Sequence, residues 1–453
     1  MLLRSGKKLI HKNSCSDIDE INEDIITRLP VDVLKKILCL LPESEANRTR
    51  ILSYKWTEIC AFLPNLRFVM PSCVSIEQAN KFHSYVDATL AIRGTEPIKR
   101  FSISYSKICN YRHADALLCT LVSQYKVQEI DLTFPDDHRK RIRFCWPLFK
   151  TCKTLVALTL KGKFVLDVPG DVLFPCLKKI DLVSIVYSCD TSLTNLISGC
   201  PELEELYVER LITDDNLKIF KVSSPFLKRL GINFSLDTSR VLVVDIDAPK
   251  IEYLDIIGQM YTCIFSIEPM CITEARVSIN ASIRNRLLMC LSSAKILAFT
   301  NETIRCLTDI RVSNLPVFPN LVKFEIGMDA IWHPNWLLAL LNNMPNLVHI
   351  TLSERLRLPH NYHIIDWDPP VEAPDCLRFK IKEILIENET GTHEEFIFIK
   401  YLLKRSNNLE KITINADRFH PKRVEKILNF PCGSSLCQIR LKYLQDPDDS
   451  LHI

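Results

Sequence analysis

The chain has 453 residues, of which 47% are hydrophobic and 25% are charged, values typical of a folded globular protein. Its formal net charge of +3 is too small to indicate nucleic-acid binding by itself. The N-terminus lacks the apolar run of a signal peptide, and no apolar stretch approaches the length of a membrane span. We therefore expect neither a nucleic-acid partner nor a membrane partner.

The 18 cysteines are scattered and include no C-x-x-C pair, which argues against a zinc site and against a disulfide framework. A reducing compartment, cytoplasmic and/or nuclear, fits this pattern. With only 10 glycines the sequence contains no Gly-rich phosphate loop, and it has no H-E-x-x-H or G-x-S-x-G motif. We expect no catalytic residue, no cofactor and no metal.

The N-terminal region differs in pattern from the rest of the chain. Residues 1–19 are polar and are expected to form a disordered tail. Residues 20–66 follow a helical period, with Pro30 suited to the first position of a helix that ends at Pro42. The apolar positions of this helix form one i, i+4 row and a second row beside it, namely Val33, Ile37 and Leu41, and Leu34 and Leu38.

Two further short helices are expected in the same segment. Ser44 is a plausible N-cap for one, and the other begins after Ser53 and carries Trp56. A segment of this size buries too little surface to be a stable domain alone. It therefore needs a partner, either the rest of this chain or another protein.

A short apolar pattern, L-x-x-L-x-L, then returns about a dozen times at a spacing of roughly 20 to 34 residues, as in leucine-rich repeats. Each unit is too small to bury its own apolar face, so stacked units form a solenoid, predicted over residues 67–365. The clear copies are Leu155–Leu158–Leu160, Leu177–Ile180–Leu182, Leu203–Leu206–Val208, Leu227–Leu230–Ile232, Ile251–Leu254–Ile256, Leu321–Phe324–Ile326, Leu347–Ile350–Leu352, Ile381–Ile384–Ile386, Leu409–Ile412–Ile414 and Leu436–Ile439–Leu441.

The alternation of helical stretches, tight links and strands predicts an α/β fold with parallel strands on the concave face and helices outside. In each repeat, the residues directly before and after the middle apolar residue face the concave side. The residues before it are mostly basic, and the residues after it are mostly acidic. Concave solenoid faces commonly bind partners. We expect substrate contact from Glu205, Tyr207, Arg229, Asp255, Lys323 and Glu325.

The repeat pattern is interrupted at Trp367–Ala373. This interruption predicts a boundary near residue 366 and a C-terminal domain over residues 366–453. This part resembles the FBD domain of plant F-box proteins. The matching residues are Trp367–Pro369, Pro374–Cys376–Leu377, Lys382–Glu383–Ile384, Glu394–Phe396, Tyr401–Leu403, Leu409–Glu410–Lys411 and Ser434–Cys437–Ile439.

The helical segment 20–66 resembles an F-box of the kind found in plant F-box proteins with leucine-rich repeats. The residues that carry this resemblance are Leu29–Pro30, Val33–Leu34, Ile37–Leu38, Leu41–Pro42, Ala46, Arg48–Thr49, Leu52–Ser53 and Trp56. Together the two resemblances identify the chain as a member of the F-box/FBD/LRR family, with a helical F-box, a leucine-rich-repeat solenoid and an FBD-type end.

The resemblance implies a non-catalytic, substrate-recognition subunit of a Skp–cullin–F-box ubiquitin ligase. Its partners would be a Skp-type adaptor, through it a cullin, and an unknown protein substrate. The expected adaptor contacts are Leu29, Pro30, Val33, Leu34, Ile37, Leu38, Leu41, Pro42 and Trp56, and an apolar surface formed by Leu29, Pro30, Ile37, Leu38 and Leu41 is expected to stay partly exposed. The alternatives are a scaffold without ligase coupling, whose F-box-like segment packs on its own solenoid, and a repeat-based receptor for a small molecule.

Overall fold

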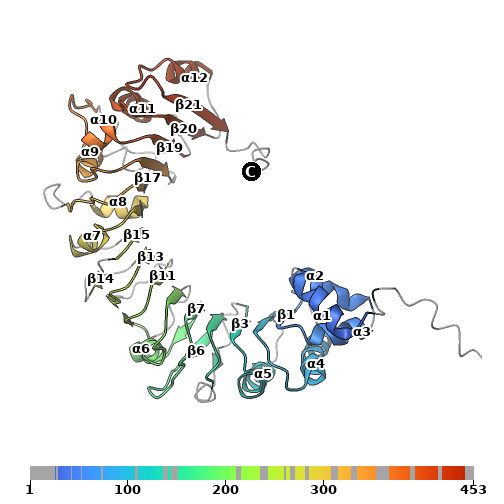
Figure 1. Ribbon diagram of the computed structural model, residues 1–453. Helices are drawn as coiled ribbons and strands as arrows, with labels where there is room; N and C mark the ends of the chain where they lie inside the picture. The colour runs from blue at the N-terminus through green and yellow to red at the C-terminus, as the bar shows by residue number, and fades with distance from the viewer. Residues whose placement is uncertain are drawn as a thin grey trace, which may run out of the picture.

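The computed structural model shows an open arc, with the N-terminal helices at one end and the C-terminal strands at the other (Figure 1). The predicted tail 1–19 and Pro42 lie outside the residues that the structure describes. Those residues are 26, 29–41, 43–52, 54–72, 75–107, 111–135, 141–143, 152–210, 216–234, 243–259, 262–265, 271–280, 285–307, 315–327, 334–353, 367–387, 393–416 and 421–443.

A single parallel sheet lines the inner side of the arc (Figure 1). Within the described residues it has 15 strands, each hydrogen-bonded in parallel to the next. In order these are β1 (Asn65–Val69), β2 (Arg100–Ser104), β3 (Glu129–Thr133), β5 (Ala157–Lys161), β7 (Lys179–Val183), β9 (Glu205–Glu209), β11 (Arg229–Phe234), β13 (Tyr253–Gln259), β15 (Glu274–Asn280), β16 (Ile296–Phe299), β17 (Lys323–Gly327), β18 (His349–Ser353), β19 (Glu383–Ile386), β20 (Lys411–Ala416) and β21 (Gln438–Tyr443).

The apolar repeat explains each strand. In β9, for example, Leu206 and Val208 are fully buried, and the preceding Leu203 fills the core from the link. Glu205 and Tyr207 alternate with them on the concave side, because successive side chains of a strand point to opposite faces. The predicted parallel strands and the predicted concave positions are confirmed.

Strands β2, β3 and β16 follow weaker copies of the apolar pattern, whereas two strands of the sheet were not foreseen. Strand β1 begins within the segment predicted as F-box, and Leu66 and Phe68 supply its buried residues. Strand β15 carries Ala275 where the other repeats have a large apolar residue, with Val277 two positions later. The small alanine hid this repeat in the sequence.

The outer side of the arc carries helices at most repeats, as predicted (Figure 1). They are α4 (Ile76–Arg93), α5 (Tyr111–Gln124), α6 (Asp190–Ser198), α7 (Asn285–Leu291), α8 (Asn301–Leu307), α9 (Pro334–Asn342), α10 (Asp375–Phe379), α11 (His393–Arg405) and α12 (Pro421–Leu428). The longest of them, α4, begins with a capping box in which the Ser75 hydroxyl accepts from the Gln78 amide and the Gln78 side chain accepts from the Ser75 amide.

At two stretches of the outer side, short strands take the place of helices. Repeat length does not decide the difference, since Leu230 and Leu254 lie 24 positions apart and enclose β12, whereas Ala275 and Leu297 lie only 22 apart and enclose α7. The outer strands form two small parallel sheets, β4 (Ile142–Arg143), β6 (Phe164–Leu166) and β8 (Val186–Tyr187), and β10 (Ile219–Ser223), β12 (Val243–Asp247) and β14 (Thr262–Phe265).

The N-terminal segment forms α1 (Val31–Leu40), α2 (Glu43–Arg48), a 3₁₀ turn at Thr49–Ile51 and α3 (Tyr54–Ala61). Helix α2 begins before Ser44, so Ser44 lies inside that helix and is not its N-cap. Arg93, at the end of α4, joins this segment to the solenoid. Its guanidinium is buried and donates to the carbonyl oxygens of Ala61 and Leu63, at 2.7 and 2.6 Å.

The sheet continues without a break into the C-terminal region. Strand β18 lies before the boundary predicted near residue 366, and it pairs directly with β19, which lies after it. Strands β20 and β21 extend the same sheet, with α11 and α12 following the repeat order. The domain boundaries themselves stay predictions.

Candidate functional site

Helix α1 has two apolar faces with different surroundings. The inner face packs in a small core that is separate from the core of the solenoid. This core consists of Leu34, Leu38, Ala46, Trp56, Ile59, Cys60 and Leu63, with Leu29 packed against it. The N-terminal helices therefore bury part of their apolar surface without help from a partner.

The outer face of α1 stays in contact with solvent. Val33 is 40% exposed, Ile37 37% and Leu40 86%. We call the α1 outer surface the set Val33, Ile37, Leu40 and Leu41. Ile51 and Leu52, at the end of the 3₁₀ turn that follows α2, are exposed as well. Exposed apolar side chains that gather on one face commonly mark a partner site.

The residues expected to touch an adaptor divide between these two faces. The prediction that Leu38 belongs to an exposed surface is wrong, because Leu38 lies one helical turn after Leu34 on the inner face. Trp56 is buried in the same core. Pro30 is exposed at the N-cap of α1, one position before the helix in which it was expected. Leu40 was missed, although its i+3 spacing from Ile37 placed it on the outer face.

On the concave face, the residues just before the middle apolar residue of each strand form what we call the first row. The prediction that this row is mostly basic is wrong, because it alternates in sign along the sheet. Its charged members, in sheet order, are Arg100, Glu129, Lys179, Glu205, Arg229, Glu274, Lys323, Glu383 and Lys411, with His349 beside Glu383. Opposite charges on adjacent strands attract one another.

In the N-terminal half of the sheet these charges pair within the chain. Lys179 lies 3.3 Å from Glu205 on the next strand and 3.9 Å from Asp181 on its own strand. Arg100 lies 3.9 Å from Glu129 and within ion-pair distance of Asp131. Burial raises the pKa of Asp181, while Lys179 and the Thr159 hydroxyl act in the opposite direction.

The six residues expected to contact a substrate fall into two groups. Glu205, Tyr207, Arg229 and Asp255 lie on the adjacent strands β9, β11 and β13. Lys323 and Glu325 lie on β17, three strands beyond β13, which corresponds to about 14 Å at the usual strand spacing. The structure does not bring the two groups together.

The first group is largely occupied by its own contacts. Gly231 leaves room for the Tyr207 ring, because a Cβ at that position would lie 2.6 Å from it. The Tyr207 hydroxyl donates to Glu209 at 3.1 Å, and burial, followed by Glu209, raises the pKa of Tyr207. Arg229 covers the Tyr253 ring at 4.1 Å. These contacts hold the side chains against the sheet.

Asp255 is the exception in this group. Its Oδ1 atom is buried and has no hydrogen-bond partner among the described residues. Burial raises the pKa of Asp255, and the charge of Arg276 on the next strand opposes this shift.

The second group lies in a hollow of about 510 Å³ on the concave face of strands β16 to β21. We call it the C-terminal groove. Small or apolar side chains form its floor, namely Ala298, Thr351, Leu385 and Thr413, and charged ones surround them, namely Lys323, Glu325, His349, Glu383, Lys411 and Lys442. Sequence reasoning singled out only Lys323 and Glu325 here, although the repeat Ile381–Ile384–Ile386 also places Glu383 on this face.

The groove keeps several charges without an ion-pair partner. Lys323 and Lys411 have no carboxylate within 4 Å among the described residues. The strands beside Lys323 present Ile296 and His349 to it, and Glu383, on the strand next to Lys411, lies 3.3 Å from His349 instead. Glu325 accepts a hydrogen bond from the Ser353 hydroxyl at 2.8 Å. Burial, and then the charge of Glu325, raises the pKa of Glu387.

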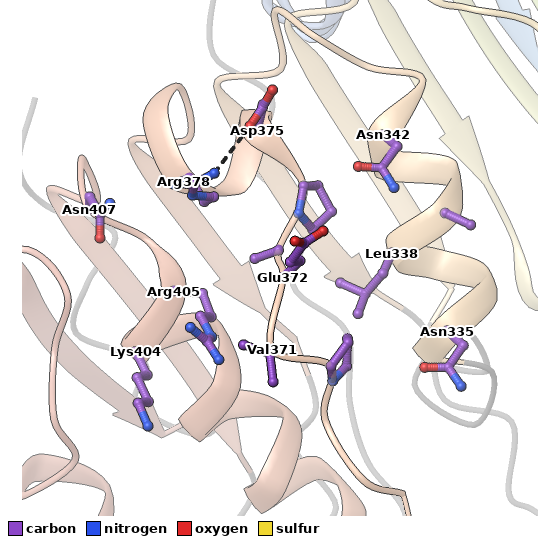
Figure 2. A pocket seen from close by; sticks show the side chains of 14 residues that line it. Asn335, Leu338, Asn342, Val371, Glu372, Asp375, Arg378, Lys404, Arg405 and Asn407 are labelled. Atoms are coloured by element: carbon purple, nitrogen blue, oxygen red, sulfur yellow. Dashed lines mark ion pairs between the residues drawn. The ribbon is translucent and has the colours of Figure 1, made fainter.

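A larger hollow of about 840 Å³ lies on the other side of the sheet, between α9, α10 and the end of α11 (Figure 2). Arg378 and Asp375 pair across 3.5 Å at its edge, and Lys404 and Arg405 end α11 beside it. Basic residues in the last turn of a helix interact favourably with the helix dipole. This explains the presence of Lys404 and Arg405 at the end of α11 without a bound ligand.

Among the described residues, no three His, Cys, Asp or Glu side chains gather in a way that could hold a metal ion. No helix in that part of the chain is both long and apolar enough to cross a membrane. Burial raises the pKa of Cys200 and Cys376 to about 12, so these thiols stay protonated and unreactive at neutral pH.

Comparison with known proteins agrees with this architecture. Residues 116–347 match the family model of the leucine-rich repeats of the FBD-associated F-box protein At5g56370, which is half of the chain. The chain belongs to the F-box/FBD/LRR-repeat family. Residues 369–414, which include α10, β19, α11 and most of β20, match the FBD model.

Relatives of the family align along nearly the whole chain. The putative F-box/FBD/LRR-repeat protein At5g56810 of Arabidopsis thaliana is 26% identical over 94% of this chain and 98% of its own length. The F-box/FBD/LRR-repeat protein At3g52680 of the same plant is 27% identical over 93% and 94%. The putative FBD-associated F-box protein At3g50710, also from Arabidopsis thaliana, is 28% identical over 92% of this chain and 100% of its own length.

Proposed function

We propose that this chain is a substrate-recognition subunit of a Skp–cullin–F-box ubiquitin ligase. In this role the α1 outer surface binds a Skp-type adaptor, and the concave face of the solenoid holds a protein substrate. The family supports an F-box role. The chain then contributes no chemistry of its own and accelerates ubiquitin transfer by holding the substrate close to the charged enzyme. This role places the protein in the cytoplasm or the nucleus.

The observation that carries the proposal is the exposure of the α1 outer surface. The inner face of α1 already has its own core, so Val33, Ile37 and Leu40 are not needed to hold the three helices together. Fully burying an aliphatic side chain stabilises by roughly 1.5–3 kcal/mol, so a partner that covers this row gains several such contributions. The rival in which the segment packs on its own solenoid leaves this exposure unexplained.

The proposal is tested by capture of the full-length chain on a purified Skp-type adaptor. Replacing Ile37 and Leu40 by Asp should weaken binding at least about a hundredfold, since 1.4 kcal/mol corresponds to a factor of ten. Both positions are exposed, so the helices should stay folded and the thermal melt should not move. Met289→Asp is the matched control, because Met289 is 53% exposed on α7, far along the arc.

A third variant separates contact from folding. Leu38→Asp places a carboxylate in the small core of the N-terminal helices, where an unpaired charge is costly. It should therefore abolish binding by unfolding the segment, with a loss of helical signal that Ile37→Asp does not cause. No capture of the wild-type chain, or equal capture of the Ile37 and Leu40 variant, would contradict the proposal and favour the scaffold without ligase coupling.

A further inference from the structure

The last strand of the sheet, β21, has one edge without a neighbouring strand among the described residues (Figure 1). On its other edge, the Gln438 amide donates to the carbonyl oxygen of Glu410, just before β20, at 2.9 Å. The backbone groups of successive residues in a strand point to opposite sides, so Ile439 and Leu441 direct their N–H and C=O groups to the free edge. Such a row of backbone groups is a template for an added strand.

The apolar side of the last repeat is open at the same edge. Leu436 is 75% exposed, whereas Leu409, which occupies the same position in the preceding repeat, is fully buried. Ile439 and Leu441 are half-buried, although the equivalent Ile412 in β20 is fully buried. At the other end of the sheet helix α2 packs against β1, so an open end is not a general feature of this solenoid (Figure 1). Exposed apolar surface of this kind favours a further covering element.

The concave side of this edge is basic. Arg440 and Lys442 on β21 are exposed, and Lys411 on β20 has no carboxylate within 4 Å in the described part of the chain. The remaining concave positions of these two strands are uncharged, namely Thr413, Asn415 and Gln438. A strand added beside β21 therefore meets positive charge on its concave side.

A second copy of the chain is a poor occupant of this edge. Two β21 strands could pair antiparallel with their apolar side chains on one face. In the two longest registers of this kind, Arg440 faces Arg440 or Lys442 of the second copy. Like charges directly opposite one another destabilise a sheet. A strand that fits must instead place acidic side chains beside Arg440 and Lys442 and apolar ones beside Ile439 and Leu441, because successive side chains point to opposite faces.

We propose that the free edge of β21 binds an extended segment of a partner protein, with the pattern apolar–acidic–apolar–acidic–apolar, as an added strand. Its backbone hydrogen-bonds to Ile439 and Leu441, and its apolar side chains cover these residues and Leu436. Its acidic side chains pair with Arg440 and Lys442. The alternating pattern reads the same in both directions, so it fits a parallel and an antiparallel strand alike. This surface lies apart from the α1 outer surface, and the inference does not depend on ligase coupling.

Fluorescent peptides test the pattern against the full-length chain by polarisation. At low salt, a peptide with the core Ile-Asp-Val-Glu-Ile should bind at least about tenfold more tightly than Ile-Lys-Val-Lys-Ile, whose charges are reversed, and the difference should shrink as salt screens the charges. It should also bind at least about tenfold more tightly than Ile-Val-Ile-Asp-Glu, which keeps the composition and loses the alternation.

Two N-methylated forms of the first peptide test the backbone pairing. One is methylated at its apolar residues and the other at its acidic residues. Only every second amide of an added strand faces β21, so one form should lose binding and the other should keep it. Loss in the form methylated at apolar residues indicates an antiparallel strand, and loss in the other form indicates a parallel one.

Substitutions then locate the binding at β21. Arg440→Glu with Lys442→Glu should abolish binding of Ile-Asp-Val-Glu-Ile and create binding of Ile-Lys-Val-Lys-Ile, a gain that local damage to the fold cannot produce. Arg67→Glu is the matched control, because Arg67 is exposed on the concave side of β1 at the other end of the sheet. It should leave the binding of both peptides unchanged.

Equal binding of the acidic, reversed and scrambled peptides, or of the two N-methylated forms, would overturn the inference. So would an equal loss in the Arg67 control. A dimer of the chain that dissociates when Ile-Asp-Val-Glu-Ile is added, measured by light scattering, would make a second copy the occupant and would equally overturn it.

No binding of Ile-Asp-Val-Glu-Ile by the wild-type chain at millimolar concentration would overturn the inference as well. In that case a variant with Asp446→Asn, Asp448→Asn and Asp449→Asn identifies the reason, because these three acidic residues follow β21 in the sequence. Binding by this variant alone would make the chain's own acidic segment the occupant of the edge.

Discussion

The N-terminal and C-terminal halves of the concave face are built on the same repeat, but they differ in whether their charged side chains are paired within the chain. Around β7 and β9 the first row neutralises itself, with Lys179 between Asp181 and Glu205. Between β17 and β20 the same row leaves Lys323 and Lys411 without a carboxylate partner among the described residues. One end is therefore satisfied within the chain, while the other holds its charges available for a ligand.

The difference arises from a few residues and not from the backbone. Lys179 faces Glu205 directly across the strand register, so the two side chains meet. Lys323 faces Ile296 on one side and His349 on the other, and neither carries a negative charge. A solenoid can thus change from a self-paired surface to an available one without any change in its core, because core and surface residues alternate along each strand.

The largest effect should come from removing core residues, and it should be the same at both ends. Leu206→Ala in β9 and Ile384→Ala in β19 each leave a cavity in a fully buried position, at a cost of about 2–5 kcal/mol. Thermal melts together with hydrogen exchange of the neighbouring strands check this. Leu385→Ala, on the groove floor, is the control and should cost much less. If either core substitution were tolerated, the two ends would differ in their core as well as in their surface.

A smaller effect should distinguish the two first rows. Lys179→Ala removes two ion pairs and should lower the free energy of unfolding by about 0.2–1 kcal/mol. Lys323→Ala removes none and should leave it unchanged. Urea unfolding at low salt measures the difference, which should vanish at about 1 M salt. Equal losses from both variants would show that Lys323 has a partner and would weaken the contrast.

Much of this fold could be predicted from the sequence, because each L-x-x-L-x-L copy indicates both where a strand lies and which of its residues are buried. The exceptions have physical causes. Ala275 is small enough to hide strand β15. The apolar pattern does not encode whether the outer side forms a helix or a strand, because repeats of similar length do either: Leu230 and Leu254 enclose β12, whereas Ala275 and Leu297 enclose α7.

The candidate sites were less predictable, because they depend on neighbours that are distant in sequence. The outward row of α1 could be read from its period, but the burial of Leu38 depends on Trp56 and Ile59 from another helix. The exposure of Leu436 depends on β21 having only one neighbouring strand among the described residues, and the pattern Leu436–Ile439–Leu441, which matches the buried repeats, gives no sign of it. The sign of each row could be read only after every strand was known.

The smallest predicted effects are two opposite pH dependences, one at each end. In the paired half, the half-buried Glu204 just before β9 accepts from Lys178 and Lys228 at 2.8 and 2.9 Å, and these hydrogen bonds lower its pKa to about 2. The ionised carboxylate therefore stabilises the fold above its ordinary pKa of about 4.3, and the contribution is lost as the pH falls toward 2. Glu204→Gln should melt slightly lower at pH 7, with the difference disappearing near pH 2.

At the other end Glu387 should behave in the reverse way. Burial and the charge of Glu325 raise its pKa, so the folded chain holds this proton more tightly than the unfolded chain does. Protonation therefore stabilises the fold at low pH, and this contribution is lost as the pH rises from about 4.3 through the raised value. Glu387→Gln removes the cost of the ionised carboxylate and should raise the melting temperature at pH 7 by at most about one degree, with no gain near pH 4. Melts of both variants from pH 2 to 8 measure the two slopes. Slopes of the same sign would mean that the Glu387 carboxylate is already stabilised by partners within the chain.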